Sequence, residues 1–284
     1  MEDYVTKNCS GLNKADIYKA YLECFEDLII REEIDEAEFF KKYFIHEANS
    51  LIYSYITYDK ERPVALLLGG IIRYDDIKTM RCGFLGISRD YKDIQILENL
   101  LEVHYKDALT KKCCMLLLEV AEGSERVNSL YKKNGYENAY FIKTYIFKGP
   151  RNWVEKNVSI EEIDISRIRK LKPILNETHM NWENDIDCIS KIDSVIYYGV
   201  LDRYNISGFM AFNMTGNIFR IWTHPAHRNK GIARALISKI MDIIDSENLK
   251  VSVSSNAGIS NFLRRLGFEK EDLTLIEMVK PVLW

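Results

Sequence analysis

The stretch "THPAHRNKGIARALISKI", Thr223 to Ile240, places two histidines, an arginine, a lysine and a glycine directly before an apolar-periodic run. Ile232, Leu236 and Ile240 share one face of the predicted helix. The first N–H groups of a helix have no intrahelical partner, and the helix dipole is positive at that end. Gly231 removes the Cβ that would hold a ligand away from the backbone. The stretch therefore indicates a phosphate or pyrophosphate site, although a solvated helix start with a glycine cap fits the same residues.

Length and charge limit the number of domains and the classes of partner that the chain can have. The 284 residues suit two domains better than one, at about 150 residues per domain. Hydrophobic residues make up 47% and charged residues 29% of the chain, as in ordinary globular proteins. The net charge of -3 argues against a nucleic-acid partner held mainly through phosphate contacts.

The cysteines and the apolar runs bear on metals and membranes. The six cysteines show neither CxxC spacing nor a His–Cys cluster, so we expect buried, reduced thiols and no metal site. The N-terminus lacks the apolar core of a signal peptide, and no apolar run reaches the roughly 18 residues of a membrane span. We therefore expect a cytoplasmic protein without a membrane partner.

Helical and extended patterns alternate along the chain, which predicts an α/β protein. We expect helices at residues 15–29, 95–109, 126–135, 165–180, 185–192, 231–248 and 258–267. We expect strands at residues 50–59, 64–74, 113–121, 136–147, 194–202, 206–214, 217–224, 249–256 and 273–282.

The two ends of this alternation match. "SERVNSLYKKNGYE", residues 124–137, aligns with "NAGISNFLRRLGFE", residues 256–269, as a helix, two basic residues, one residue, Gly, an aromatic residue and Glu. The order of elements around both segments favours a duplicated fold, although helix–Gly–aromatic is also a common helix ending. With a break at Gly149 and Pro150, we expect domains at 1–150 and 151–284.

At this point the sequence resembles a known family. "RNKGIA", residues 228–233, fits the Arg/Gln-x-x-Gly-x-Gly/Ala signature of the GNAT superfamily of acyl-CoA-dependent N-acyltransferases, and "NFLRRLGFE" is similar to its "LYxKxGFE" ending. The resemblance covers Ile160 to the C-terminus and, more weakly, "LYKKNGYE" at residues 130–137. It implies an α/β (α+β) fold of two tandem GNAT-like domains, each a mixed, mostly antiparallel sheet flanked by helices.

The resemblance also implies roles for the matched positions. Backbone N–H groups of the signature would bind the coenzyme A pyrophosphate, at Arg228, Asn229, Lys230, Gly231, Ile232 and Ala233. The preceding strand end would pair with the pantetheine arm and offer an N–H to the thioester carbonyl, at Ile221, Trp222 and Thr223. Asn256 would hydrogen-bond the pantetheine or the nucleophile. The implied acyl donor is acetyl-CoA, without a metal.

The sequence departs from the family pattern at the expected proton donor. The family has a tyrosine before its final Gly-Phe, where this chain has Leu263. Leucine cannot protonate the departing thiolate, so water or another residue must do so.

The first half departs in the opposite way. Tyr131 stands where the family's tyrosine would be, but Gln95 and Leu97 replace Gly231 and Ala233. Asp90 and Asp93 add negative charge near this helix start. We expect a degenerate copy that does not bind coenzyme A and that supports the fold or the acceptor pocket, with Tyr131 as a packing residue.

No general base is evident. "THMNWENDIDC" holds His179, Glu183, Asp185 and Asp187 in the region that lines the family's acceptor site, which hints at a cationic amine. The same residues also fit a solvated acidic loop with a helix cap at Asp185. We take Asn256 and Glu183 as the candidate catalytic residues.

Other side chains are weaker candidates for a role in the site. Glu277, on the last predicted strand, is a third candidate for the general base. His224 and His227 fit exposed loop histidines. Trp182 and Trp222 could shape the acceptor pocket or belong to the core.

The residues and the resemblance together predict an N-acetyltransferase. It would move an acetyl group from acetyl-CoA to a primary amine, in the C-terminal domain, with a small molecule as acceptor. A protein or peptide amine is an alternative acceptor. A non-catalytic acyl-CoA-binding sensor is the alternative from another class.

Overall fold

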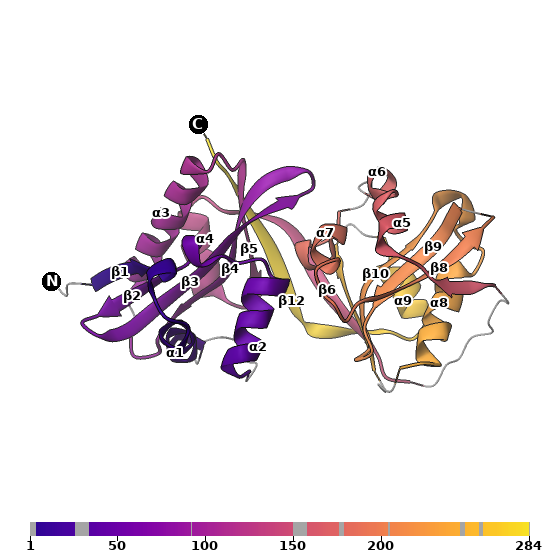
Figure 1. Ribbon diagram of the computed structural model, residues 1–284, viewed down its shortest axis with the longest axis horizontal. Coiled ribbons are helices and arrows are strands. Elements are labelled where there is room, and N and C mark those ends of the chain that lie inside the picture. The colour runs from indigo at the N-terminus through magenta and orange to yellow at the C-terminus, as the bar shows by residue number, and fades with distance from the viewer. Residues whose placement is uncertain are drawn as a thin grey trace. The chain divides into compact units, whose positions relative to one another are not determined.

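The computed structural model describes residues 4–25, 34–91, 93–149, 158–175, 179–203, 205–244, 248–255 and 258–283. The chain forms two compact units (Figure 1). Unit 1 comprises Met1–Tyr140 together with Leu275–Trp284, and unit 2 comprises Phe141–Thr274.

Unit 1 contains one mixed sheet. Its strands, in spatial order, are β1 (Tyr4–Asn8), β2 (Tyr55–Asp59), β3 (Arg62–Tyr74), β4 (Ile77–Ile87), β5 (Met115–Ala121) and β12 (Glu269–Pro281). Neighbours are antiparallel except β4 and β5, which are parallel.

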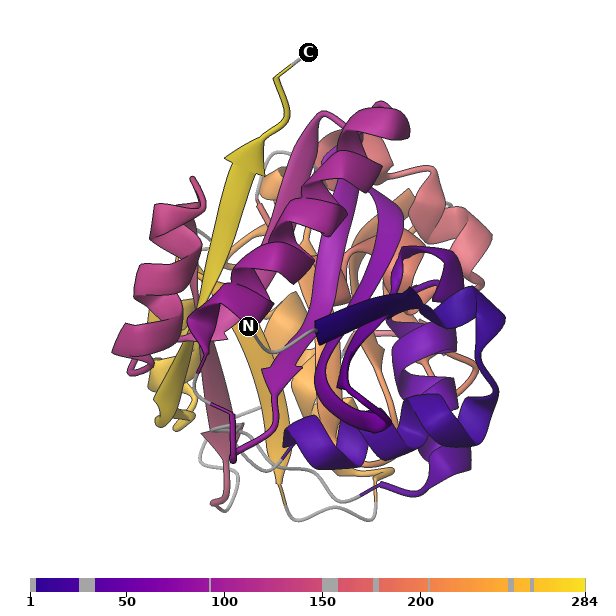
Figure 2. The same cartoon turned by 90° about the vertical axis from the view of Figure 1, so that its left-hand side faces the viewer.

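Helices cover both faces of this sheet, and in Figure 2 they lie on different sides of the strands. The helices α3 (Ile94–Thr110) and α4 (Glu125–Lys133) pack on one face, and α1 (Lys14–Phe25) and α2 (Glu36–Phe40) pack on the other. Three shorter turns connect the elements: η1 (Cys9–Gly11), the π-helical η2 (Lys41–His46) and η3 (Leu51–Tyr53).

Unit 2 repeats this arrangement. Its strands, in spatial order, are β6 (Glu137–Phe147), β11 (Leu249–Ser254), β10 (Asn217–Thr223), β9 (Asn205–Phe212), β8 (Ile196–Asp202) and β7 (Ile160–Glu162). Only the neighbours β10 and β11 are parallel among the described pairs.

Each face of the unit 2 sheet has its own helices. The helices α8 (Ile232–Met241) and α9 (Ser260–Arg265) pack on the face that carries Val251 and Val253. The short helices α5 (Ile165–Arg169), α6 (Lys172–Leu175) and α7 (Ile186–Ile189) pack on the face that carries Phe209 and Ala211. Below, these are the α8 face and the α7 face.

The two halves of the sequence exchange a strand. Residues 142–147 of β6 pair with residues 249–254 of β11 in unit 2. Residues 275–281 of β12 pair with residues 115–121 of β5 in unit 1, where the yellow strand lies beside β5 in Figure 1. The compact units therefore differ from the expected division into 1–150 and 151–284. Hydrophobic periodicity finds strands, but it does not say which sheet a strand joins.

Most expected elements are present, and the differences have local causes. The predicted helix 231–248 ends at Met241, and the predicted helix 165–180 is divided into α5 and α6, with Pro173 in the first turn of α6. The sequence pattern does not predict β1, β4, β7 or α2. The eleven-residue strand β4, "IKTMRCGFLGI", mixes charged, small and apolar residues, so it lacks a clear period of two. Cys114 is exposed, whereas the other five cysteines are buried as expected.

Candidate functional site

The loop between β10 and α8 has an unusual backbone. Asn229 and Gly231 both adopt left-handed conformations, with φ of 62° and 86°. Such residues, flanked by right-handed or extended neighbours, turn successive N–H groups toward one point and form a concave anion site. Glycine tolerates this conformation without strain, which explains its place at residue 231.

The helix start behind this loop is open. Gly231 is the N-cap of α8, and no side chain in the described part of the chain accepts a hydrogen bond from the first-turn N–H groups. The equivalent helix of unit 1, α3, is capped by Asp93, whose carboxylate accepts a hydrogen bond from Gln95 N at 3.0 Å. An anion can therefore satisfy the α8 donors, whereas the protein's own carboxylate already occupies those of α3.

Side chains hold the loop in place. His224 Nδ1 accepts a hydrogen bond from Ala226 N at 3.2 Å, which caps the turn η5 (Pro225–His227). The Arg228 Nε group donates to Thr223 O at 3.4 Å. Both histidines are half-buried rather than exposed as expected, because the backbone of His224 also donates to Ser207 O on β9 and His227 packs edge-on against the His224 ring.

A pocket of about 610 Å³ opens beside this loop. Strands β10 and β11 pair at Asn217–Lys250 and Ile218–Val251, and β10 carries a bulge between Ile218 and Arg220. Beyond the bulge both strands contribute residues to the pocket lining, so the pocket lies where β10 and β11 separate.

The structure brings most of the predicted binding residues together. Eight of them line the pocket: Ile221, Trp222, Thr223, Arg228, Asn229, Gly231, Ile232 and Ala233. Lys230 is exposed and is not among the lining residues. Asn256 lies outside the described residues. The roles of all these residues stay predictions.

Glu183, the other candidate catalytic residue, is not placed in this pocket. It is exposed in the turn η4 (Trp182–Asn184) and is absent from the described lining. Trp182, by contrast, is buried beside it and does not line the pocket.

The neighbouring acidic residues are engaged by α7 and α6. Asp185 caps α7 by accepting a hydrogen bond from Asp187 N at 2.8 Å, and burial raises the pKa of its carboxyl. Asp187 forms an ion pair with Lys172 at 2.8 Å. This arrangement fits the helix-cap alternative for the acidic loop.

Glu277 lies in unit 1, because β12 completes that sheet. Its carboxylate accepts a hydrogen bond from the buried Tyr74 hydroxyl at 2.9 Å. Burial, followed by the nearby Glu277, raises the pKa of Tyr74. The residue thus has a partner in the core of unit 1 and is no part of the unit 2 pocket.

Arg220 also lines the pocket and was not predicted from the sequence. The residue is 5% exposed, and its guanidinium donates to Leu175 O at 3.2 Å and to Asn184 O at 3.4 Å. These bonds join β10 to the end of α6 and to the turn η4. A lone arginine within the apolar strand "NIFRIWT" was the signal that could have identified it.

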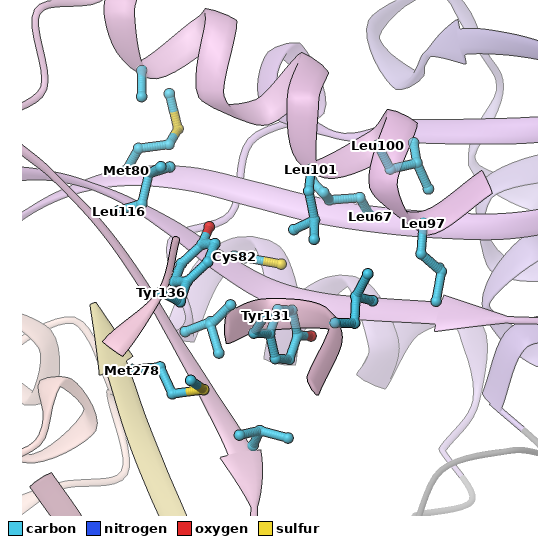
Figure 3. Close-up of a cluster of buried hydrophobic side chains, with 14 of the residues drawn as sticks. Leu67, Met80, Cys82, Leu97, Leu100, Leu101, Leu116, Tyr131, Tyr136 and Met278 are labelled. Carbon is cyan, nitrogen blue, oxygen red and sulfur yellow. The ribbon is translucent and has the colours of Figure 1, made fainter. Parts of the chain in front are cut away.

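In unit 1, apolar side chains fill the space next to β4 and β5 (Figure 3). Tyr131 and Tyr136 are 5% and 3% exposed, their ring centroids lie 5.7 Å apart, and burial raises the pKa of both hydroxyls. Cys82 and Leu97 pack in the same cluster. This environment fits the expected packing role of Tyr131.

The loop before α3 is shorter than the loop before α8. Residues 88–93 connect β4 to α3, whereas residues 224–231 connect β10 to α8. Asp93 therefore occupies the N-cap position that Gly231 holds in unit 2, and Gln95 corresponds to Ala233 rather than to Gly231. The alignment of Gln95 with Gly231 was wrong, because it matched residues by their distance from the end of the preceding strand and the two loops differ in length.

Residues 164–268 match the model of the Acetyltransferase (GNAT) family. The part of the chain that carries the candidate site is therefore similar to GNAT acetyltransferases. The match includes the whole loop between β10 and α8 and the pocket described above.

Solved structures extend the likeness to the whole chain. A GCN5-related N-acetyltransferase from Sphaerobacter thermophilus superposes with a TM-score of 0.69 at 12% identity, covering 98% of this chain and 96% of the other. A tandem GNAT protein from the clavulanic acid biosynthesis pathway gives a TM-score of 0.69 at 10% identity, covering 99% of each chain. A putative acetyltransferase from Pyrococcus horikoshii gives 0.66 at 12% identity, covering 99% and 90%.

At these identities the likeness concerns the fold, and the predicted tandem GNAT fold is confirmed. A comparison with curated proteins finds no significant match. In the described part of the chain, no helix is long and apolar enough to cross a membrane.

Proposed function

We propose that this GNAT protein transfers an acetyl group from acetyl-CoA to the primary amine of a small molecule, in the pocket of unit 2. The observation that carries the proposal is the uncapped start of α8, with left-handed Asn229 and Gly231, opening into a pocket between separating strands. The family transfers acyl groups from acyl-CoA. The acetyl donor and the small-molecule acceptor are the finer parts of the proposal.

The residues of the pocket fit the pyrophosphate and the pantetheine arm of coenzyme A. The first-turn N–H groups of α8 would bind the pyrophosphate, with the cationic Arg228 and Arg234 in the same lining. The pantetheine arm would follow the free edge of β10. Strand β9 pairs with one edge of β10 through Thr223, whereas the pairing with β11 stops at Ile218. Alternate backbone N–H groups between these points therefore face the pocket.

One of these N–H groups, at Ile221 or Trp222, would donate to the thioester carbonyl. Negative charge develops on that oxygen as the amine nitrogen attacks the carbonyl carbon, and a positioned donor of this kind contributes about 3–4 kcal/mol. The C–S bond breaks, and its electron pair leaves on the sulfur. The nitrogen gives up one proton and the thiolate takes one, so the products are the acetamide and the coenzyme A thiol.

Leu263 stands at the position of the family's proton donor and cannot protonate the thiolate. It is 1% exposed on α9 and carries no proton to donate. We assign this protonation to water, because a coenzyme A thiol leaves acceptably as a thiolate. The same leucine favours the second candidate function, a sensor that binds acyl-CoA without turnover.

Unit 1 is proposed as a copy that does not bind coenzyme A. The Asp93 cap occupies the donors of α3, and Tyr131 and Tyr136 fill the space beside β4 and β5. We propose that unit 1 supports the fold or shapes access for the acceptor.

Calorimetric titration of acetyl-CoA tests the proposed site. Gly231→Glu places a carboxylate and a Cβ at the left-handed cap, so acetyl-CoA affinity should fall at least 100-fold. Gln95→Glu changes the exposed position in the first turn of α3 and should leave the affinity unchanged. Thermal unfolding of both variants checks that the fold is intact. Unchanged acetyl-CoA binding by a folded Gly231→Glu protein would place the site elsewhere.

Release of thiol then separates the enzyme from the sensor. An enzyme releases coenzyme A with at least one primary amine from a broad panel, and the acetamide appears in equal amount. A sensor binds acetyl-CoA with the same dependence on Gly231 and releases no thiol.

A further inference from the structure

The pocket of unit 2 has two chemically different sides. Val251, Val253 and Phe262 belong to the cluster under α8 and α9, on the same side of the sheet as the open start of α8. Leu175, Phe219 and Trp222 belong to the cluster under α5 to α7, and they line the same pocket. The pocket thus passes between β10 and β11 from the α8 face to the α7 face. A ligand with phosphates at α8 occupies the first side, which leaves the second side for the other reactant.

The α7 side is apolar and aromatic. Leu175 is 2% exposed, while Phe219, Met180 and Trp222 are half-buried and face the pocket. The Trp222 ring packs against Phe209 at 5.8 Å between centroids, so its orientation is fixed by the core of the unit. Such walls favour apolar ligand surface, because contact with them removes that surface from water.

The described charges of this pocket are all cationic. Arg220 lies on the α7 side, and Arg228, Arg234 and Arg265 line the rest. No aspartate or glutamate is among the described lining residues. Of the nearby carboxylates, Glu183 is exposed, Asp185 caps α7 and Asp187 pairs with Lys172. The carboxylate of Asp202 lies 3.9 Å from Nε2 of His227, a titratable residue of the lining.

We propose that the α7 side binds a monoamine with an aromatic or branched apolar body, in its uncharged form, rather than a polycationic amine. This inference rests on the proposed function, which makes the α7 side the place where the acceptor amine binds. It differs from the expectation drawn from the acidic loop, because the described carboxylates of that loop do not reach the pocket lining.

Burial acts on the protonation state of the bound amine. Removal of the amine from water disfavours its ammonium form. The neutral amine is the nucleophilic form, so the pocket selects the reactive species and the proton goes to bulk water before binding. This accounts for a pocket whose described lining holds no carboxylate base. A second ammonium group, as in a polyamine, would be buried beside apolar walls, and no aspartate or glutamate among the described lining residues would pair with it.

The test uses the full chain saturated with coenzyme A, so that binding is measured without turnover. Calorimetry compares 2-phenylethylamine with spermidine between pH 7 and pH 9. We expect 2-phenylethylamine to bind at least tenfold more tightly than spermidine. Its affinity should rise about tenfold per pH unit, as the fraction of neutral amine does below the ordinary amine pKa. Tighter binding of spermidine, or an affinity that does not change with pH, would overturn the proposal.

A matched pair of variants sharpens the result. Phe219→Glu adds a carboxylate to the α7 side and should reverse the preference toward spermidine. Leu273→Glu adds the same charge at a position of unit 2 that is 39% exposed and outside the pocket lining, and it should leave the preference unchanged. Equal effects of the two variants would show that the lining does not set the preference.

The design separates this inference from the proposed function. Amine binding in the expected order without formation of acetamide from acetyl-CoA would refute the transferase and keep the acceptor class. Acetylation of spermidine in preference to 2-phenylethylamine would refute the acceptor class and keep the transferase. Failure of the chain to bind coenzyme A would overturn both.

Discussion

At the scale of single residues, His104 is a buried titratable group whose ring nitrogens form no hydrogen bond in the described part of the chain. Its ring lies on α3 at 0% exposure. Burial, followed by the nearby Arg81, lowers its pKa to about 3. The imidazole is therefore neutral in the folded protein well below the pH at which it becomes protonated in the unfolded chain.

This difference predicts acid-sensitive stability of unit 1. Between the ordinary value of about 6.5 and the folded value of about 3, the unfolded chain binds one more proton. The free energy of unfolding should thus fall as pH drops through this window, by about 1.4 kcal/mol per unit. Urea unfolding at pH 6.5 and pH 5 should differ by about 2 kcal/mol more in the wild type than in His104→Leu. Parallel pH dependence in the two proteins would assign the acid sensitivity to other groups.

At the scale of elements, the two equivalent helices α3 and α8 begin in opposite ways. Asp93 closes the start of α3 with its own carboxylate, whereas Gly231 leaves the start of α8 open. A helix N-terminus is stabilised by either kind of anion, internal or bound. Both helix starts therefore favour an anion, and we propose that a bound anion supplies the negative charge at α8.

Substitution of the cap separates stability from binding. Asp93→Ala should lower the free energy of unfolding of unit 1 by about 1 kcal/mol, because Gln95 N loses its acceptor. The affinity for acetyl-CoA should not change, since the space beside β4 and β5 stays filled by Tyr131 and Tyr136. Urea unfolding and calorimetry measure the two quantities. A second acetyl-CoA site in Asp93→Ala would show that the cap alone keeps unit 1 from binding.

The elements also show what the sequence could predict. The α8 loop was predictable because Gly231, the flanking cations and the apolar period of the helix are all local features. Arg220 and Leu175 were not, since a strand bulge and the segment between α6 and α7 bring them to the pocket. The acidic loop suggested an acceptor site by composition, but Asp185 caps α7 and Asp187 accepts a hydrogen bond from Lys172 on α6.

At the scale of the whole molecule, the exchanged strands decide what folds as a unit. Residues 142–147 of β6 complete the sheet of unit 2, and Ile142, Tyr145 and Phe147 are 3%, 0% and 3% exposed. Residues 275–281 of β12 likewise complete unit 1, where Ile276 and Met278 are 5% and 0% exposed. A division of the chain at residue 150 would remove a core strand from each unit.

Two fragments of similar length test this dependence. Residues 137–274 keep every strand of unit 2, whereas residues 151–284 lose β6 and retain the β12 residues that belong to unit 1. Loss of three large buried side chains costs about 2–5 kcal/mol each, comparable to the whole stability of a domain at about 5–15 kcal/mol. Fragment 137–274 should unfold cooperatively on heating, followed by circular dichroism, and fragment 151–284 should show no cooperative transition. Equal cooperative unfolding of both fragments would mean that β6 is dispensable and that unit 2 is complete without the first half of the chain.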